Sequence, residues 1–313
     1  MKLSLSVALF ALFNVIAGHA GHGHDGRKAN IPTKQLNDGN HIPTLGLGTF
    51  GFDDIPKVRK AINWAIVAGY RHIDTAALYG NEVEIGKGIS DVLKRRLVKR
   101  EDLFITTKLW NDKHGRHQVV PALKESLAKL GLRYVDLYLV HSPEATDENG
   151  APADIDYLET WQGMEEAKAL GLTQSIGVSN FDTEQIDRIK AHSKIVPAVN
   201  QIEVHPSNTQ DQAIRDCFER NIAVIAYSPF GFFVSRGKGP SRDDPKIVNI
   251  AKKYNKSVNQ VLLRYLLDRD LIPIPKSTNQ SRIQENIDVF DFHLTPEEVA
   301  TISSFNTDTS IFS

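Results

Sequence analysis

Short apolar runs alternate with longer amphipathic stretches along most of this chain. Eight runs have the pattern of strands buried on both faces, at residues 45–50, 71–76, 103–109, 135–142, 174–180, 198–204, 223–229 and 271–277. Helical patterns fill the intervals between them. Strands that alternate with helices run parallel, with the helices packed outside the sheet. Eight such units without a break in composition predict an α/β fold, a single closed (β/α)8 TIM barrel.

The chain differs from this pattern at its beginning. Lys2 is followed by the apolar run at residues 3–17 and by small residues up to Ala20, which predicts a signal peptide cleaved after Ala20 and a secreted protein. The run is short for a bilayer span, although a signal anchor remains the alternative. Residues 21–29, rich in Gly and His, predict a flexible segment before a single domain at residues 30–313. That domain begins with a β-hairpin predicted around the Asn-Asp-Gly turn at residues 37–39.

Composition narrows the partners and the chemistry. The 313 residues carry a formal net charge of −1, which gives no reason to predict a nucleic acid or a membrane surface as a partner. Cys217 is the only cysteine, so no internal disulfide forms, and its helical surroundings predict a buried side chain. His22 and His24 are too few for a closed metal site, so no metal is expected. Asn255 and Asn279 begin two glycosylation sequons.

Residues 45–54 (LGLGTFGFDD) hold glycines at the spacing of a dinucleotide-binding fingerprint. In a Rossmann unit the third glycine lies where the helix begins, and the helix N-terminus binds pyrophosphate. Here the aspartates at 53–54 follow Gly51 and would repel a phosphate. We therefore expect the match to be accidental. In a barrel, three residues of this stretch would form the first βα loop at the catalytic rim: Gly46, Gly48 and Thr49.

Four polar residues lie at the ends of consecutive predicted strands. Asp74 ends the second, Tyr79 follows it, Lys108 ends the third and His141 ends the fourth. Each alone has an ordinary interpretation: a helix cap, a loop aromatic, a solvated lysine or a core histidine. Because the carboxyl ends of barrel strands meet at one rim, the four together predict a catalytic site.

The four residue types favour one reaction. A tyrosine with a pKa near 10 is a weak acid at neutral pH, and an adjacent ammonium lowers that pKa. A carboxylate paired with the ammonium would hold it in place. The phenol could then protonate an oxygen that acquires charge, while a histidine orients that oxygen. This chemistry suits carbonyl reduction.

Nine motifs carry a resemblance that spans residues 31–306. They occur in family order as LGLGTF, GYRHIDTA, YGNE, TKLW, DLYLVHSP, IGVSNF, NQIEVHP, AYSPFG and IPIPKS. In these the chain resembles the aldo-keto reductases. The resemblance implies a (β/α)8 barrel, NADPH as cofactor, a small-molecule carbonyl substrate, a monomer, and a catalytic tetrad made of Asp74, Tyr79, Lys108 and His141.

The resemblance also implies a set of cofactor contacts. Ser179, Asn180 and Gln201 would contact the nicotinamide amide, and Tyr227 would stack on the ring. Lys276, Ser277 and Arg282 would bind the adenosine 2′-phosphate, with Glu285 and Asn286 near the adenine. Gly48, Thr49 and Ser228 complete the implied set. The two cations near the eighth strand agree independently with a phosphate site and favour NADPH over NADH, the alternative being ordinary surface charge.

Aromatic residues near the tetrad in sequence are candidates for an apolar substrate pocket, with core packing as the alternative: Phe50, Trp110, Phe230, Phe232 and Phe233. The N-terminal signal and the segments WNDKHGRHQVVPALKESL, DYLETWQGMEEAK and KYNKS are similar to secreted insect members of the family that reduce 3-dehydroecdysone. That likeness implies a steroid 3-ketone as substrate. A broad aldehyde-detoxifying reductase and a secreted binding protein without turnover stay open.

Overall fold

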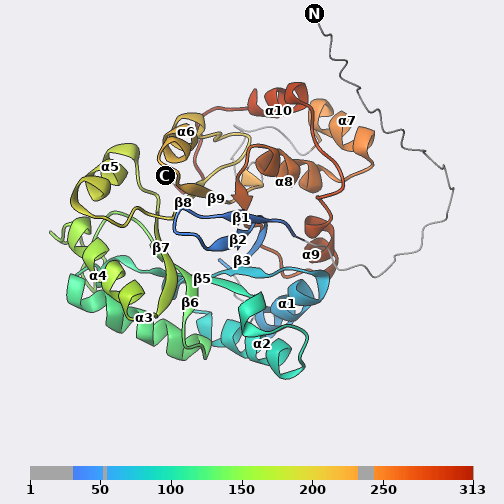
Figure 1. Ribbon diagram of the computed structural model, residues 1–313. Coiled ribbons are helices and arrows are strands. Elements are labelled where there is room, and N and C mark those ends of the chain that lie inside the picture. The colour runs from blue at the N-terminus through green and yellow to red at the C-terminus, as the bar shows by residue number, and fades with distance from the viewer. Residues whose placement is uncertain (1–30, 52–54, 232–242, 313) are drawn as a thin grey trace, which may run out of the picture.

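Eight parallel strands form a barrel in the computed structural model, which describes residues 31–51, 55–231 and 243–312 (Figure 1). Neighbours in the sheet are neighbours in the chain. The strands are β3 (Gly46–Gly48), β4 (His72–Asp74), β5 (Phe104–Leu109), β6 (Val135–Val140), β7 (Thr173–Ser179), β8 (Val199–Glu203), β9 (Ala223–Tyr227) and β10 (Ile272–Pro273). The predicted TIM barrel is confirmed. The predicted signal peptide and Gly/His-rich segment lie outside the described residues.

Helices surround the barrel, as Figure 1 shows. They are α1 (Ile55–Ala68), α2 (Glu82–Lys94), α3 (Arg116–Leu130), α4 (Tyr157–Ala169), α5 (Thr183–His192), α6 (Asp211–Glu219), α7 (Pro245–Tyr254), α8 (Val258–Asp268), α9 (Gln280–Ile287) and α10 (Pro296–Ser303). Cys217 is buried in α6, as predicted. Within the described residues, no helix is both long and apolar enough to cross a membrane.

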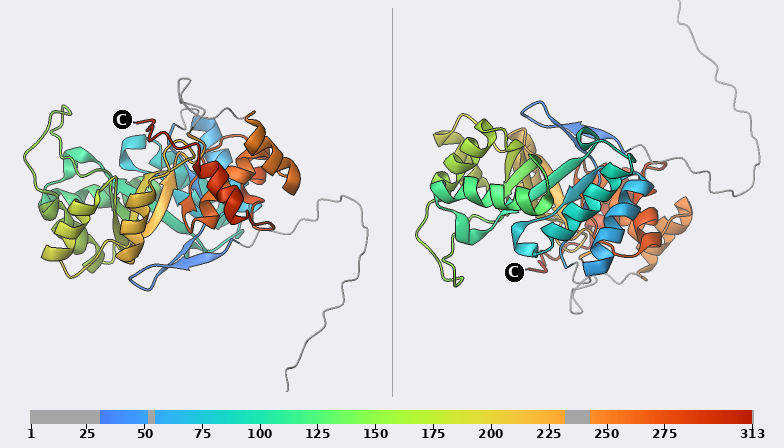
Figure 2. Two further views of the ribbon diagram at one scale, coloured as in Figure 1. Left: turned by 90° about the horizontal axis from the view of Figure 1, so that it is seen from above. Right: turned by 90° about the horizontal axis from the view of Figure 1, so that it is seen from below.

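The predicted hairpin is confirmed and closes one end of the barrel. Strands β1 (Thr33–Gln35) and β2 (His41–Pro43) pair antiparallel. Leu36 and Ile42 are buried there, in one cluster with inward-facing side chains such as Leu137. In Figure 2 the hairpin lies at one end of the molecule and the C-terminus at the other. The opposite end, where the strands finish, is therefore the end that is open to a substrate.

Two glycines let the first and last strands meet. The Gly48 amide donates to the Pro275 carbonyl at 3.1 Å, and a Cβ on Gly48 would lie 2.6 Å from the Ile274 carbonyl oxygen. A Cβ on Gly46 would lie 2.6 Å from the His72 ring on β4 and 3.0 Å from the Ile274 side chain after β10. The expectation that these glycines form a loop was wrong, because both lie inside β3. Their spacing serves barrel closure, where no side chain fits.

The two-residue period of the strands separates the interior from the outer layer. On β5, Ile105 and Leu109 pack in the large cluster between strands and helices, whereas Phe104 belongs to the interior cluster. Lys108 shares the interior parity with Phe104. Asp74 on β4 and His141, just after β6, occupy equivalent inward positions at the ends of their strands. The same alternation that builds the core thus gathers the polar residues at one rim.

Candidate active site

Lys108 and Asp74 form a buried ion pair at the rim. Lys108 Nζ lies 2.5 Å from Asp74 Oδ1, and both side chains are almost fully inaccessible. The ammonium also donates to the Thr75 carbonyl at 3.1 Å and to the Tyr79 hydroxyl oxygen at 3.2 Å. Burial alone would lower the pKa of Lys108, but the charges of Asp74 and Tyr79 raise it above its ordinary value. The lysine therefore stays an ammonium within contact of the phenol.

Tyr79 is presented by a single turn of 3₁₀-helix, Ala77–Tyr79, that follows β4. Gly80 ends this turn with a φ of 67°, a left-handed conformation that glycine adopts without strain. Burial raises the pKa of the Tyr79 phenol, and Lys108 opposes that rise without reversing it. The sequence-based expectation of a lowered pKa was therefore wrong in its net direction. Lys108 has the expected effect, but the loss of hydration is larger.

His141 faces the phenol from the end of β6. Its ring is edge-on to Tyr79 at a centroid distance of 5.8 Å and to Trp110 at 5.1 Å. Burial, aided by the charge of Lys108, lowers the pKa of His141 to about 3. The imidazole is therefore neutral at physiological pH and can donate one N–H to a carbonyl oxygen. Its Nδ1 atom has no partner among the described residues.

Gln201 completes the ion pair in a way that the sequence analysis missed. Its side-chain amide donates to Asp74 Oδ2 at 2.7 Å, so each oxygen of that carboxylate has a partner. Gln201 was predicted only as a cofactor contact. The signal was available, because Gln201 lies on the inward-facing parity of β8, between Val199 and Glu203. The contact joins strands that are 127 residues apart in sequence.

A cavity of about 710 Å³ opens above the tetrad. Of the predicted substrate contacts, Phe50, Trp110 and Phe230 line it, whereas Phe232 and Phe233 lie outside the described residues. Ser142 lines it too, as do residues that the sequence analysis did not select: Leu78, Asn111, Ile311 and Phe312. Ile311 and Phe312 lie near the C-terminus, so motifs close to the tetrad in sequence could not indicate that they line the cavity.

The cavity is also lined by the four residues predicted to contact the nicotinamide, Ser179, Asn180, Gln201 and Tyr227, and by three further predicted cofactor contacts, Gly48, Thr49 and Ser228. The Tyr227 hydroxyl donates to Asn180 Oδ1 at 2.9 Å, and Asn180 Nδ2 donates to the His141 carbonyl at 3.0 Å. Asn180 and Ser228 have positive φ angles of 62° and 50°. Left-handed backbone at two strand ends is the kind of strain that functional sites retain.

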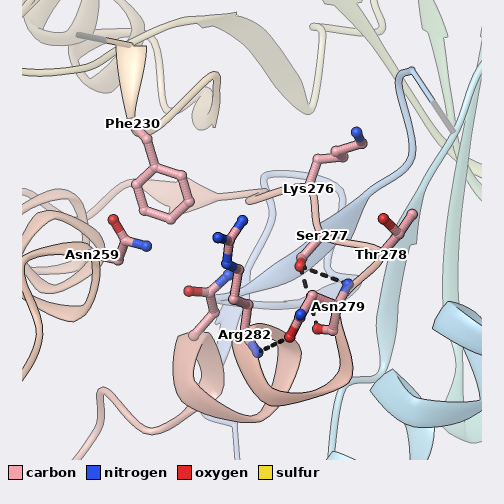
Figure 3. Close-up of a pocket in the computed structure, with 8 residues that line it drawn as sticks. Phe230, Asn259, Lys276, Ser277, Thr278, Asn279 and Arg282 are labelled. Atoms are coloured by element: carbon pink, nitrogen blue, oxygen red, sulfur yellow. Dashed lines mark hydrogen bonds between the residues drawn. The ribbon is translucent and has the colours of Figure 1, made fainter. Parts of the chain in front are cut away.

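A second cavity, of about 250 Å³, contains the predicted phosphate contacts (Figure 3). Lys276, Ser277, Arg282 and Asn286 line it, and in Figure 3 Arg282 rises from the first turn of α9 toward Phe230. Lys276 and Phe230 line both cavities, so the two adjoin.

Glu285, predicted near the adenine, lines neither cavity. Its carboxylate accepts a hydrogen bond from the Ser257 hydroxyl at the start of α8. The other predicted contacts fit an elongated dinucleotide. A phosphate fits beside Lys276 and Arg282 at the start of a helix, and a flat ring fits against Tyr227 beside the tetrad.

The family follows from comparison with known proteins. The model of the aldo/keto reductase family matches residues 44–307. The chain belongs to the aldo-keto reductases. The oxidoreductase class predicted from the motifs is thus confirmed. Aldo-keto reductase AKR2E4 of Bombyx mori is 60% identical over 284 residues, which cover 88% of this chain and 92% of that protein. Human aldo-keto reductase family 1 member A1 is 42% identical over 87% of this chain and 88% of its own length.

Solved structures of aldo-keto reductases show the same fold. The crystal structure of Bombyx mori AKR2E4 in complex with NADP matches with a TM-score of 0.88 at 58% identity, covering 90% of this chain and 94% of the other. That of AKR2E5 complexed with NADPH also gives 0.88, at 43% identity, covering 91% and 90%. Those two proteins bind the cofactor that the sequence predicts for this one.

Proposed function

We propose that this aldo-keto reductase reduces a ketone or aldehyde with NADPH, and that its natural substrate is a steroid 3-ketone of the 3-dehydroecdysone kind. The observation that carries the reductase proposal is the contact of the Tyr79 phenol with the Lys108 ammonium inside a cavity that also contains His141. A phenol that contacts an ammonium and lies beside a neutral imidazole can donate its proton to a carbonyl oxygen on which negative charge develops.

The chain's own residues divide the work at the carbonyl oxygen. When bound, NADPH supplies the hydride that reaches the carbonyl carbon. Tyr79 gives its proton to the oxygen as negative charge develops there, and the Lys108 ammonium stabilises the phenolate left behind. The neutral His141 donates a hydrogen bond that orients the oxygen, and this preorganised dipole favours the charged transition state. Asp74 keeps the ammonium in position.

Three observations support an extended apolar substrate. The cavity of about 710 Å³, which the substrate would share with the nicotinamide ring, falls within the roughly 300–1,000 Å³ range that takes ligands of drug size. Its mouth is lined by large apolar side chains, among them Phe50, Leu78 and Phe312, which are half or nearly half exposed. The similarity of the chain to secreted insect reductases of 3-dehydroecdysone agrees with a steroid.

Initial rates of NADPH oxidation test this proposal. With 3-dehydroecdysone and 4-nitrobenzaldehyde as competing candidates, a higher kcat/KM for the steroid is the expected result. A higher value for the aldehyde would favour the broad aldehyde-detoxifying reductase. No turnover of either carbonyl, with the ligands still bound, would instead indicate a binding protein on a reductase scaffold.

We also propose that the protein acts outside the cell. The apolar run after Lys2 supports secretion, which N-terminal sequencing of protein from the medium tests. A first residue near Gly21 is expected, and an uncleaved chain would refute secretion.

The Asn279 side chain caps α9 through its oxygen, 3.1 Å from the Arg282 amide, at the edge of the smaller cavity. A glycan there would crowd the phosphate site, so Asn279 is expected to be unmodified in active secreted protein. Full occupancy by mass spectrometry, with activity retained, would contradict this.

A further inference from the structure

The end of the chain forms part of the cavity wall. Residues after α10 run back over the barrel rim, and Ile311 and Phe312 line the larger cavity. The Phe312 ring is edge-on to Phe50 and to Tyr227, at centroid distances of 5.9 Å in each case. The C-terminal tail, defined here as residues 307–312, therefore connects the substrate side of the cavity to the cofactor side.

One buried carboxylate holds this tail. Glu203 is the last residue of β8 and is 3% exposed. Its Oε2 atom accepts from the Ser310 hydroxyl at 2.9 Å, and its Oε1 atom accepts from the Ile311 backbone amide at 2.7 Å. The Ser310 hydroxyl oxygen in turn accepts from the Phe312 amide at 3.1 Å. Because hydrogen bonds to an ionised acceptor are stronger than neutral ones, Glu203 fixes Ser310 and Ile311, the two residues directly before Phe312.

His205 contacts the Glu203 carboxylate and helps to hold it in place. Its Nε2 atom lies 2.7 Å from Glu203 Oε1, and the imidazole is 1% exposed. Gly231 packs directly on that ring, where a Cβ would lie only 2.2 Å away. The pair Glu203–His205 thus contacts the tail on one side and the segment after β9 on the other. Two backbone bonds, from Thr307 and Thr309 to the Ser207 carbonyl at 3.2 and 3.0 Å, align the tail further.

We propose that Glu203 is a positioning residue for substrate selection. Glu203 makes no hydrogen bond to the tetrad within the described residues, but it places Ser310 and Ile311 so that Phe312 covers the mouth of the cavity. A large apolar ketone would gain contact with this wall, whereas a small aldehyde bound at Tyr79 would not reach it. The choice of substrates rests on the proposed function, but the position of the tail does not.

The test compares one bulky and one small substrate in the full-length protein. Glu203→Gln should raise KM for 3-dehydroecdysone by about tenfold, the scale of a lost aromatic contact, and leave kcat for propanal within about twofold. Ser310→Ala and Phe312→Ala should raise the same KM. Thr309→Ala is the matched control. The Thr309 hydroxyl bonds the hydroxyl and the carbonyl of Thr307 and has no bond to Glu203, so this variant should leave that KM unchanged.

A second readout follows the tail directly. Carboxypeptidase should release residues near Phe312 faster from Glu203→Gln than from the wild type, as seen by mass spectrometry. Equal losses of kcat for both substrates, or an unchanged KM with unchanged trimming, would overturn the proposal. If Glu203→Gln does not fold, unchanged KM values in both Ser310→Ala and Phe312→Ala overturn it instead. A wild type that reduces neither substrate would refute the proposed function, while the trimming assay would still decide the role of Glu203.

Discussion

Lys108 Nζ lies 3.2 Å from the Tyr79 hydroxyl oxygen while it pairs with Asp74 on its other side. The ammonium therefore acts on the phenol from a fixed position inside the barrel. Because the three residues come from β4, the turn after it and β5, small changes in one should be felt by the others. This coupling gives the site measurable signatures in titration, stability and rate.

The first signature is the titration of Tyr79. Burial raises its pKa above the ordinary value near 10, and Lys108 limits the rise. Ultraviolet difference titration of the wild type against Tyr79→Phe should therefore show a phenol that ionises above pH 10 in protein without cofactor. Lys108→Met should move that ionisation higher. An ionisation below pH 10 in the wild type would contradict this assignment.

The same shifts fix the pH dependence of reduction. The reaction needs the protonated phenol, which is present below the Tyr79 pKa, so kcat/KM should fall only on the alkaline side. The pKa of His141 is lowered to about 3, so its imidazole stays neutral through the acid range in which an ordinary histidine titrates. No acid limb near pH 6.5 is expected in the kcat/KM profile. An acid limb there that disappears in His141→Gln would contradict it.

The second signature is the stability of the buried ion pair. Asp74→Asn leaves the Lys108 ammonium inaccessible and without its counter-charge. Removal of one partner from such a pair costs about 3–5 kcal/mol. Urea unfolding should show a loss of that size in the free energy of unfolding for Asp74→Asn. The double variant Asp74→Asn/Lys108→Met should lose less than the single one, and a strictly additive result would refute the coupling.

Cofactor choice should depend on the smaller cavity. Lys276→Met or Arg282→Ala removes a cation that could bind a 2′-phosphate, and a hydrogen bond to a charged group is worth about 1.5–3 kcal/mol. The KM for NADPH should rise about ten- to hundredfold while that for NADH changes little. Lys252→Met, on the exposed face of α7, is the control. Equal losses for both cofactors would show that these cations do not read the phosphate.

The cavity mouth should discriminate by charge. Ser142 lines the cavity, and its hydroxyl donates to the Glu144 carboxylate. A negative charge therefore lies in direct contact with a side chain of the cavity lining. Wild-type kcat/KM should be lower for 4-carboxybenzaldehyde than for 4-nitrobenzaldehyde. Glu144→Gln should reduce the ratio of kcat/KM for 4-nitrobenzaldehyde to kcat/KM for 4-carboxybenzaldehyde by about two- to fivefold, the range of exposed charge interactions. Glu101→Gln, placed before β5 at the opposite end of the barrel, should not change it, and an equal effect from both variants would contradict the idea.

The sequence predicted the barrel, and it predicted that the tetrad residues meet at one rim, because both depend on local periodicity. Inward-facing positions recur every second residue, so Lys108 and His141 could be placed at one rim from their strands alone. The same period places Gln201 inside the barrel but does not indicate its partner, because contacts across the barrel have no local signal. Gln201 with Asp74, Glu203 with the C-terminal tail and Gly48 with the last strand each join segments far apart in the chain. They follow from closure of the barrel.

Electrostatic balance was also beyond the sequence. The charge pairing of Tyr79 with Lys108 could be predicted from residue types, but the degree of burial that outweighs it could not. That burial depends on how completely neighbouring elements exclude water. The bond from Ser257 to Glu285 likewise joins two segments that the family pattern does not relate.

The most direct measurement is the turnover of Tyr79→Phe with 4-nitrobenzaldehyde and NADPH, together with the dissociation constant for NADPH by fluorescence. The substitution removes only the proton donor and keeps the ring against Phe50. We expect kcat to fall by at least about 100-fold, the scale of a lost general acid, with NADPH binding within about twofold of wild type. A variant that retains near-normal kcat would contradict the assignment of Tyr79 as the acid and, with it, the account of this site.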